Sequence, residues 1–167
     1  DVRLIAQTSM GCRDTAFHQI YVNETPVAAI SGTDVCIGEA ISFTNSTIPN
    51  DNTIASWAWA FGDGQTDNTF EPQHTYQNFG DYTVSLTAVT DSGCQASSSI
   101  DLKVYPYPVA AFSTTIDEGC TPLSVPFANA STIPNGYSIG SYEWTFGDGT
   151  TASTSSPTHS YGAGGIY

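Results

Sequence analysis

The chain has 167 residues, 40% of them hydrophobic and 12% aromatic, so it can bury apolar cores and does not have the composition of a disordered segment. Sixteen acidic residues against three basic ones give a formal net charge of −13, which repels phosphate backbones and anionic lipid headgroups and argues against nucleic acid as a partner. No window approaches the roughly 20 apolar residues of a membrane span, so we expect no membrane insertion, and the scarcity of Lys and Arg favours an extracellular protein, secreted or on a cell surface.

The strand-forming stretches are short, alternate apolar with polar residues and are separated by turn residues, with no helical periodicity. In chain order the clearest are ISFTN at 41–45, SWAWAF at 56–61, DYTVSLTAV at 81–89 and ASSSIDLKV at 96–104. In the second stretch Trp57, Trp59 and Phe61 share one face and alternate with alanines, so we expect that face to be buried. The glycines of SMGC at 9–12 and DSGC at 91–94 predict hairpin turns.

The chain repeats itself from end to end at an offset that drifts from 82 to 85 residues. The phrase STIPN, for example, stands at 46–50 and again at 131–135. Other matching pairs are Leu4 with Leu86, Cys12 with Cys94, Cys36 with Cys120, His74 with His159 and Tyr82 with Tyr167. The repeat is therefore the architecture of the chain.

Two phrases carry a family resemblance, WAFGDG at 59–64 and WTFGDG at 144–149, together with ISFTNST before the first and EPQHTYQNFGDYTVSL after it. They resemble the polycystic kidney disease (PKD) domain over nearly the whole chain. The resemblance implies an all-β protein of tandem immunoglobulin-like β-sandwiches arranged end to end. Its motif residues are Trp59, Phe61, Gly62, Asp63 and Gly64 in one copy, and Trp144, Phe146, Gly147, Asp148 and Gly149 in the other. The family often has Asp after the Trp, whereas this chain has Ala60 and Thr145, so any role of that carboxylate is lost.

Members of this family usually serve as modules of extracellular proteins, including surface-layer proteins, secreted proteases, chitinases and large bacterial adhesins. The version with DSGC and GCTPL is similar to tandem arrays in surface proteins of gliding bacteria. The resemblance implies a non-enzymatic structural or adhesive repeat module of a long extracellular fibre or surface adhesin. Two alternatives stay open, an accessory substrate-positioning module of a secreted hydrolase and a donor-strand filament subunit. The expected partners are neighbouring repeats, with surface glycans or proteins as further candidates.

The repeat predicts three parts: the C-terminal strands of a preceding unit at 1–24, a complete unit at 25–106 and the N-terminal part of a following unit at 107–167. Asp1 aligns with Thr83, and Tyr167 aligns with Tyr82. The given sequence thus begins and ends at the same position of the repeat unit, inside a predicted strand. This register fits either a segment of a longer covalent array or subunits that lend their first strands to a neighbour. Prolines in the short linkers NETP and YPYP predict limited freedom between units.

No catalytic set of residues is expected, because the chain has no Gly-x-Ser-x-Gly elbow. His74 and His159 occupy equivalent positions of the repeat, so they are not two members of one catalytic set. For each of them a structural hydrogen bond near the following Tyr is favoured. Asp63 and Asp148 are weak candidates for calcium, with capping of their own turns as the favoured alternative. Other acidic residues near the junctions are Glu24, Asp34, Glu39, Asp117 and Glu118. No other cofactor is expected.

Aromatic side chains offer a possible carbohydrate platform, although the alternation around Trp57 and Trp59 favours burial. Tyr105 and Tyr107, in the YPYP linker, are better candidates for exposure. Glycosylation is a further possibility, since Asn23, Asn45 and Asn129 begin Asn-x-Ser/Thr triplets and Thr15 lies in an Asp-Thr-Ala segment.

The four cysteines, Cys12, Cys36, Cys94 and Cys120, form no Cys-x-x-Cys pair, so disulfides are favoured over metal. In an immunoglobulin-like sandwich, Cys94 belongs at the pole where the chain enters and Cys36 at the opposite pole, too far apart for a bond. We therefore hypothesise disulfides across domain junctions, with an ordinary bond between Cys36 and Cys94 as the open alternative.

Overall fold

The computed structural model describes residues 1–167, and every regular element in it is a β-strand. Contacts divide the chain into two compact units, Asp1–Val104 and Tyr105–Tyr167. No helix has the length and the apolar character that crossing a bilayer requires. The expected all-β fold is confirmed.

The chain begins with an antiparallel hairpin of β1 (Val2–Gln7) and β2 (Arg13–His18), in which Leu4 faces Ala16. The amide of Thr8 donates to the carbonyl of Cys12 at 2.9 Å and closes the turn. Gly11 has a φ of 88°, in the region that favours glycine, so the predicted SMGC turn is confirmed. All twelve strand residues of this hairpin are exposed.

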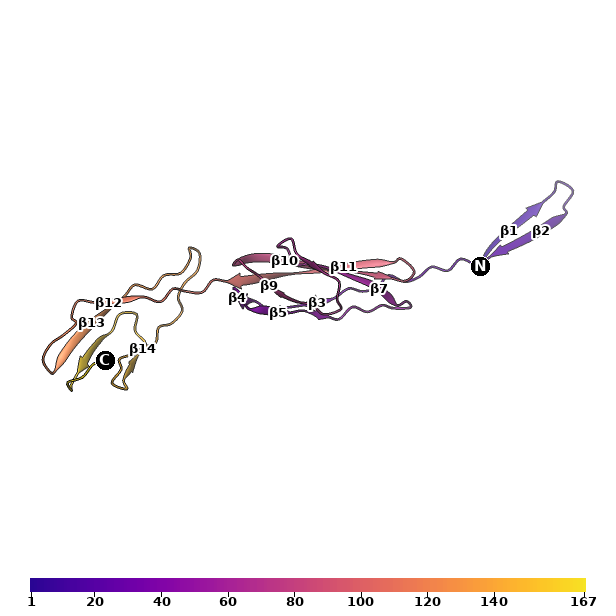
Figure 1. The fold of residues 1–167 in the computed structure, drawn as a ribbon. Coiled ribbons are helices and arrows are strands. Elements are labelled where there is room, and N and C mark those ends of the chain that lie inside the picture. The colour runs from indigo at the N-terminus through magenta and orange to yellow at the C-terminus, as the bar shows by residue number, and fades with distance from the viewer. The chain divides into compact units, whose positions relative to one another are not determined.

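The middle repeat, which we define as residues 25–106, is a two-layered sandwich (Figure 1). Its strands are β3 (Ile30–Ser31), β4 (Val35–Cys36), β5 (Ala40–Ser42), β6 (Thr44–Asn45), β7 (Ile54–Ala60), β8 (Thr66–Asp67), β9 (Gln73–Thr75), β10 (Gly80–Thr90) and β11 (Gln95–Tyr105). One layer is the sheet β4-β11-β10-β7-β8, and the other combines the pairs β3-β6 and β5-β9. The turn at 91–94 that joins β10 to β11 repeats the hydrogen bonds of the first hairpin, with Thr90 donating to Cys94.

The core lies between these layers and is built from alternating residues of the long strands. Its buried members are Ile41, Phe43, Trp59, Phe61, Tyr76, Val84, Leu86, Leu102 and Val104. Ala58 and Ala60 are exposed, as the alternation predicts. Trp57 is only partly buried and meets the ring of Phe70 at 5.4 Å. Burying side chains of this size contributes about 1.5–3 kcal/mol each.

The expectation of one continuous strand at 41–45 is wrong, because the strand is interrupted at Phe43. β5 pairs with β9, whereas β6 pairs with β3, so the chain changes partner between the two strands. At the change, the amide of Phe43 donates to the carbonyl of Pro72 and its ring lies 5.6 Å from that of Trp59. Both halves of the stretch therefore contribute to the second layer, with the break fixed by core packing.

The second unit contains five strands, β12 (Phe112–Thr114), β13 (Leu123–Asn129), β14 (Trp144–Thr145), β15 (Thr151–Ala152) and β16 (Thr158–Tyr161). They form the sheet β12-β13-β16 and the pair β14-β15. The repeat offsets give the correspondence between the two sets of strands. β12 matches β3, β13 matches β5 and β6 together, β14 matches β7, β15 matches β8 and β16 matches β9. The unit has no strands that match β10 and β11.

β14 is shorter than its counterpart for a physical reason. β7 has seven residues, six of which pair with β10, whereas β14 has two. The residues that match the first part of β7 are 139–143, and they form no strand. A strand needs a partner for its backbone groups, so this segment lacks regular structure where its partner strand is absent.

Candidate functional site

The repeated FGDG turn ends β7 and holds one carboxylate in a fixed place. In the middle repeat the amide of Phe61 donates to the carbonyl of Gln65 at 3.1 Å, and Asp63 Oδ1 accepts from the amide of Gln65 at 3.0 Å. Gly62 has a φ of 85°, and a Cβ there would lie 2.8 Å from the carbonyl oxygen of Thr83. The first glycine is therefore required both by backbone conformation and by the close approach of β10.

His74 connects this turn to the core. Its Nε2 lies 2.8 Å from Asp63 Oδ2, and its ring stacks on Phe61 with centroids 4.1 Å apart. The residue is 8% exposed. The hydroxyl of Tyr76, which is fully buried, donates to the carbonyl of Phe61 at 2.7 Å, and its ring stacks on Tyr82. We call Asp63, His74 and Tyr76 with Phe61 the turn network.

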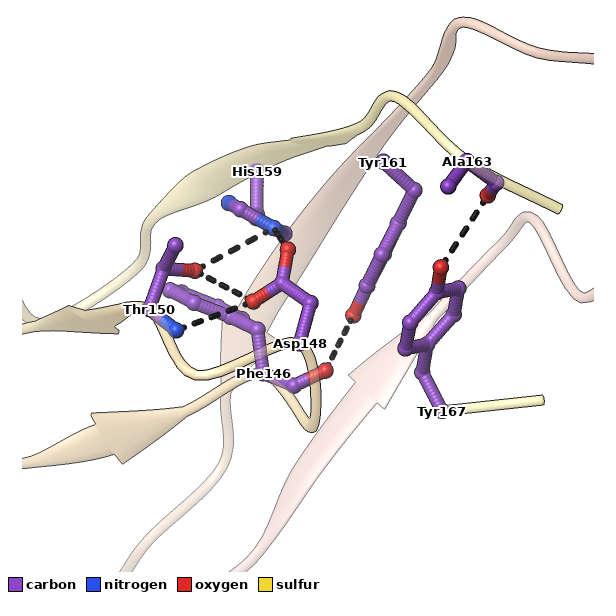
Figure 2. A network of polar contacts seen from close by, with 7 residues as sticks. All are labelled: Phe146, Asp148, Thr150, His159, Tyr161, Ala163 and Tyr167. Atoms are coloured by element: carbon purple, nitrogen blue, oxygen red, sulfur yellow. Dashed lines mark hydrogen bonds and ion pairs between the residues drawn. The ribbon is translucent and has the colours of Figure 1, made fainter. Parts of the chain in front are cut away.

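The second unit reproduces the turn network from Asp148, His159, Tyr161 and Phe146 (Figure 2). His159 Nε2 lies 2.8 Å from Asp148 Oδ2, and the Tyr161 hydroxyl donates to the carbonyl of Phe146 at 3.2 Å. Thr150 replaces Gln65 and adds a hydroxyl donor, which lies 2.6 Å from Asp148 Oδ1. The network is thus a property of the repeat.

Electrostatics favour the ionised form of both aspartates. Burial acts to raise the pKa of Asp63, but the hydrogen bonds from the Gln65 amide and from His74 outweigh it, so this pKa lies below its usual value. Hydrogen bonds from the Thr150 hydroxyl, from His159 and from the Thr150 amide lower the pKa of Asp148 to about 2. Burial, with the nearby Asp63 charge, raises the pKa of Tyr76 to about 12, so its hydroxyl stays a donor.

The turn network does not have the geometry of a catalytic triad. In a triad, one ring nitrogen of the histidine faces the carboxylate and the other faces the nucleophile. Here the same Nε2 of His159 faces both Asp148 and, at 3.4 Å, the hydroxyl of Thr150. A nitrogen that donates to the carboxylate cannot also take the proton of the hydroxyl. The arrangement fastens the turn to the sheet.

The calcium candidates Asp63 and Asp148 each use both carboxylate oxygens within the turn network. This is the arrangement of a turn-capping aspartate, which sequence reasoning favoured over a metal ligand. The structure groups neither residue with two further His, Cys, Asp or Glu side chains at metal-binding spacing. Calcium binding by this chain stays an untested prediction.

The four cysteines are free thiols in the structure. Cys36 is the last residue of β4, and β4 pairs with β11. Asp34, two residues before Cys36, accepts a hydrogen bond from the amide of Lys103, so Cys36 lies near the C-terminal end of β11. Cys94 precedes the other end of β11, about 33 Å away along ten residues of strand. A disulfide needs Cα atoms within about 7 Å, so a bond between Cys36 and Cys94 is incompatible with this fold. The disulfides across junctions, which would also involve Cys12 and Cys120, stay a prediction.

The glycosylation candidates differ in accessibility. Asn45 is 6% exposed, and its Nδ2 donates to the carbonyl of Phe70, so the folded repeat presents no free amide there. Asn129 is partly buried and accepts from the amide of Ser131. Asn23 and Thr15 are exposed. Asn23 and Thr15 are therefore the most accessible of the four candidates, and Asn45 is the least accessible.

The chain enters and leaves the middle repeat at opposite ends of β11. On entering, the carbonyl of Asn23 lies 3.8 Å from Cys94 Sγ, and the carbonyl of Thr25 accepts from Asn50 Nδ2 at 2.6 Å. On leaving, the chain continues from the last residue of β11, Tyr105. A pull on the two ends of this repeat is therefore directed along its longest strands.

Two features of these sites were not predicted from the sequence. The stacking of Tyr76 on Tyr82 has an equivalent in Tyr161 and Tyr167, whose centroids are 4.4 Å apart. The Asp-His spacing of eleven residues, identical in both copies, was the available signal for the ion pair.

The fold is thus a β-sandwich whose repeated turn network is structural. A family model described as the PKD domain matches residues 23–104 and 103–167. The chain belongs to the PKD domain family, as two tandem copies.

Among curated proteins, the chain is similar to a microbial collagenase of Vibrio alginolyticus, with 42% identity over 65 residues, which is 38% of this chain and 8% of the collagenase. It is 32% identical over 101 residues to collagenase ColA of Clostridium perfringens, covering 54% of this chain and 9% of the relative. It is 33% identical over 67 residues to the pre-pro-metalloprotease PrtV of Vibrio cholerae, 40% of this chain and 7% of PrtV. The chain spans less than a tenth of each of these relatives.

Among solved structures, the PKD1 domain of Vibrio anguillarum Epp is 32% identical, with a TM-score of 0.46 over 50% of this chain and 96% of that domain. A structure of carbohydrate-binding modules from the β-sandwich superfamily has a TM-score of 0.51 at 20% identity, over 64% of this chain and 55% of that one. The second likeness concerns the fold alone.

Proposed function

We propose that the chain is a non-enzymatic, load-bearing spacer of an extracellular protein, in which PKD repeats are joined in series. The observation that carries this proposal is the position of the chain ends in the middle repeat, at opposite ends of β11. Under tension the ten residue pairs between β10 and β11 and the six between β10 and β7 are loaded in shear, so their hydrogen bonds resist together. The acidic surface supports an extracellular location.

The turn network supports the same role. Force applied along β10 reaches the FGDG turn through Gly62, which approaches the backbone of Thr83. The Tyr76 hydroxyl and the Asp63–His74 pair fasten that turn from the side of the second layer. Buried hydrogen bonds of this kind each contribute about 1 kcal/mol, and their loss costs more.

Single-molecule force spectroscopy on residues 1–167, held at both termini, tests the proposal. Unfolding of the middle repeat, residues 25–106, is expected as one event that lengthens the chain by about 25 nm, since an extended residue spans ~3.6 Å and the fold occupies about 35 Å. Gradual extension without a discrete event of that length would contradict a load-bearing role.

An accessory module of a secreted hydrolase is the second candidate, favoured by the collagenases and the metalloprotease among the relatives. In that role the repeats would position a catalytic domain on an insoluble substrate, and glycans or collagen would be partners. Tyr105 and Tyr107, 40% and 53% exposed, are the aromatic candidates for such contact.

Co-sedimentation with collagen fibrils, cellulose and chitin distinguishes the two proposed functions. Saturable binding that is lost in the double variant Tyr105→Ser/Tyr107→Ser supports the accessory role. The absence of binding to all three supports the spacer.

A further inference from the structure

Three consecutive main-chain carbonyls of the linker before the middle repeat are held by side chains of that repeat. The three contacts are Cys94 Sγ with the carbonyl of Asn23 at 3.8 Å, Asn52 Nδ2 with that of Glu24 at 3.2 Å, and Asn50 Nδ2 with that of Thr25 at 2.6 Å. Pro26, the next residue, is buried and restricts Thr25 to an extended conformation. The linker is therefore fastened to the repeat through its backbone.

The two loops that carry these side chains, residues 49–53 and 91–94, are joined to each other. Asn52 Oδ1 accepts from the hydroxyl of Ser92 at 3.0 Å. The hydroxyl of Thr53 donates to Asp91 Oδ2 at 2.8 Å, and the amide of Asp91 donates to the carbonyl of Thr53 at 3.0 Å. None of these bonds involves the linker, so the donors are preorganised for it.

Asn50 has an unusual backbone conformation. It is the one non-glycine residue with a positive φ, 54°. Asparagine tolerates this region better than most residues, but the conformation still costs free energy. Such a cost persists where a specific contact requires it, and the short bond to Thr25 is a contact of this kind.

The second copy of the repeat has the same loop with different chemistry. Tyr137 matches Asn52 at the offset of 85, and its amide donates to the carbonyl of Pro134 to form the turn. The ring of Tyr137 meets that of Tyr105, which matches Asn23, with centroids 6.0 Å apart. The loop thus contacts the preceding linker in both copies, through amide groups in one and aromatic rings in the other.

We propose that loops 49–53 and 91–94 form a binding site for the main chain of the incoming linker, which fixes residues 23–25 on the middle repeat. We call it the linker site. Its acceptors are backbone carbonyls, so it recognises an extended segment by its main chain and not by its side chains. This goes beyond the spacer role, because a fixed linker is measured without applying force.

Nitrogen-15 relaxation of the 167-residue chain tests the proposal. The amides of Asn23, Glu24 and Thr25 should have order parameters of about 0.85, as in a rigid strand. Asn52→Asp keeps the oxygen that accepts from Ser92 but removes the donor to the linker, and it should lower these order parameters to about 0.6 or less.

A second variant and a control complete the experiment. Asn50→Gly keeps a residue that accepts a positive φ, removes the side-chain donor and should act in the same direction as Asn52→Asp. The control is Asn78→Asp, which makes the same charge change at an exposed position near the opposite end of β10. The amide signals of β10 and β11 report in the same spectra that the repeat stays folded.

The linker site predicts a loss of order at residues 23–25 in Asn52→Asp and Asn50→Gly, and none in Asn78→Asp. Low order parameters at 23–25 in the unaltered chain, or equal effects of Asn52→Asp and Asn78→Asp, would overturn the proposal. An ordered linker together with gradual extension under force would contradict the spacer role and leave the linker site standing.

Discussion

At the scale of single residues, the turn network is where the two repeats agree most closely. Asp63 and Asp148 face His74 and His159 at the same 2.8 Å distance, although one repeat has a complete core and the other does not. The network therefore depends on the local phrase FGDG and on the strand that carries the histidine, and not on the hairpin that closes the core. This local origin makes it testable by single substitutions.

Replacing Tyr76 by Phe should destabilise the middle repeat by about 1–3 kcal/mol, because the buried carbonyl of Phe61 loses its donor. The measurement is urea denaturation followed by tryptophan fluorescence in a Trp144→Phe background, so that Trp57 and Trp59 report. Tyr82→Phe is the control, since that hydroxyl bonds the carbonyl of Asn78 in an exposed place, and it should cost less than about 1 kcal/mol. Equal losses would contradict the role given to Tyr76.

Asp148→Asn should flatten the acid dependence of the second unit. The pKa of Asp148 is about 2 in the fold against 3.8 for an ordinary aspartate, so its stabilising contribution is complete above about pH 4 and is lost as the pH falls through about 2. Thermal unfolding between pH 2 and pH 6, followed by NMR signals of residues 144–161, measures the difference from the unaltered chain. That difference should shrink as the pH falls through about 2, whereas a pH-independent difference would contradict the assignment.

At the scale of elements, the two copies of one strand behave differently because their partners differ. Residues 54–60 form β7 beside β10, whereas the matching residues 139–143 form no strand. Similar local sequence thus gives different secondary structure, and pairing decides between them.

Amide hydrogen exchange should make this difference visible. In dilute solution the amides of β7 that face β10 should be strongly protected, and those of 139–143 should exchange within seconds, because they have no strand to bond. Strong protection of 139–143 in the dilute monomer would contradict the open edge.

The long strands, the hairpin turns and the aromatic face of β7 could be predicted because each has a local pattern: alternation, a glycine at positive φ, or Trp59 among alanines. The interruption at Phe43 could not, since it arises where the chain exchanges β9 for β3 as its partner. For the site, the equivalence of His74 and His159 predicted a structural hydrogen bond, and the structure shows the same contact with an aspartate in both copies. The identity of its partner, Asp63, depends on folding across eleven residues and had to come from the structure.

At the scale of the whole molecule, the chain is built by repetition of one domain. Two copies of the PKD domain share one turn network, and the middle repeat has its chain ends at opposite ends of β11. A formal charge of −13 spread over such repeats disfavours non-specific aggregation.

The central claim is that the middle repeat is built to carry load along its strands, and the most direct test is to pull it in two directions. Handles at residues 25 and 105 load β10 and β11 in shear, whereas handles at Asp81 and Lys103, which lie opposite one another, open the hairpin one residue pair at a time. We predict an unfolding force several-fold higher in the first direction. Equal forces, or a lower force along the strands, would contradict it.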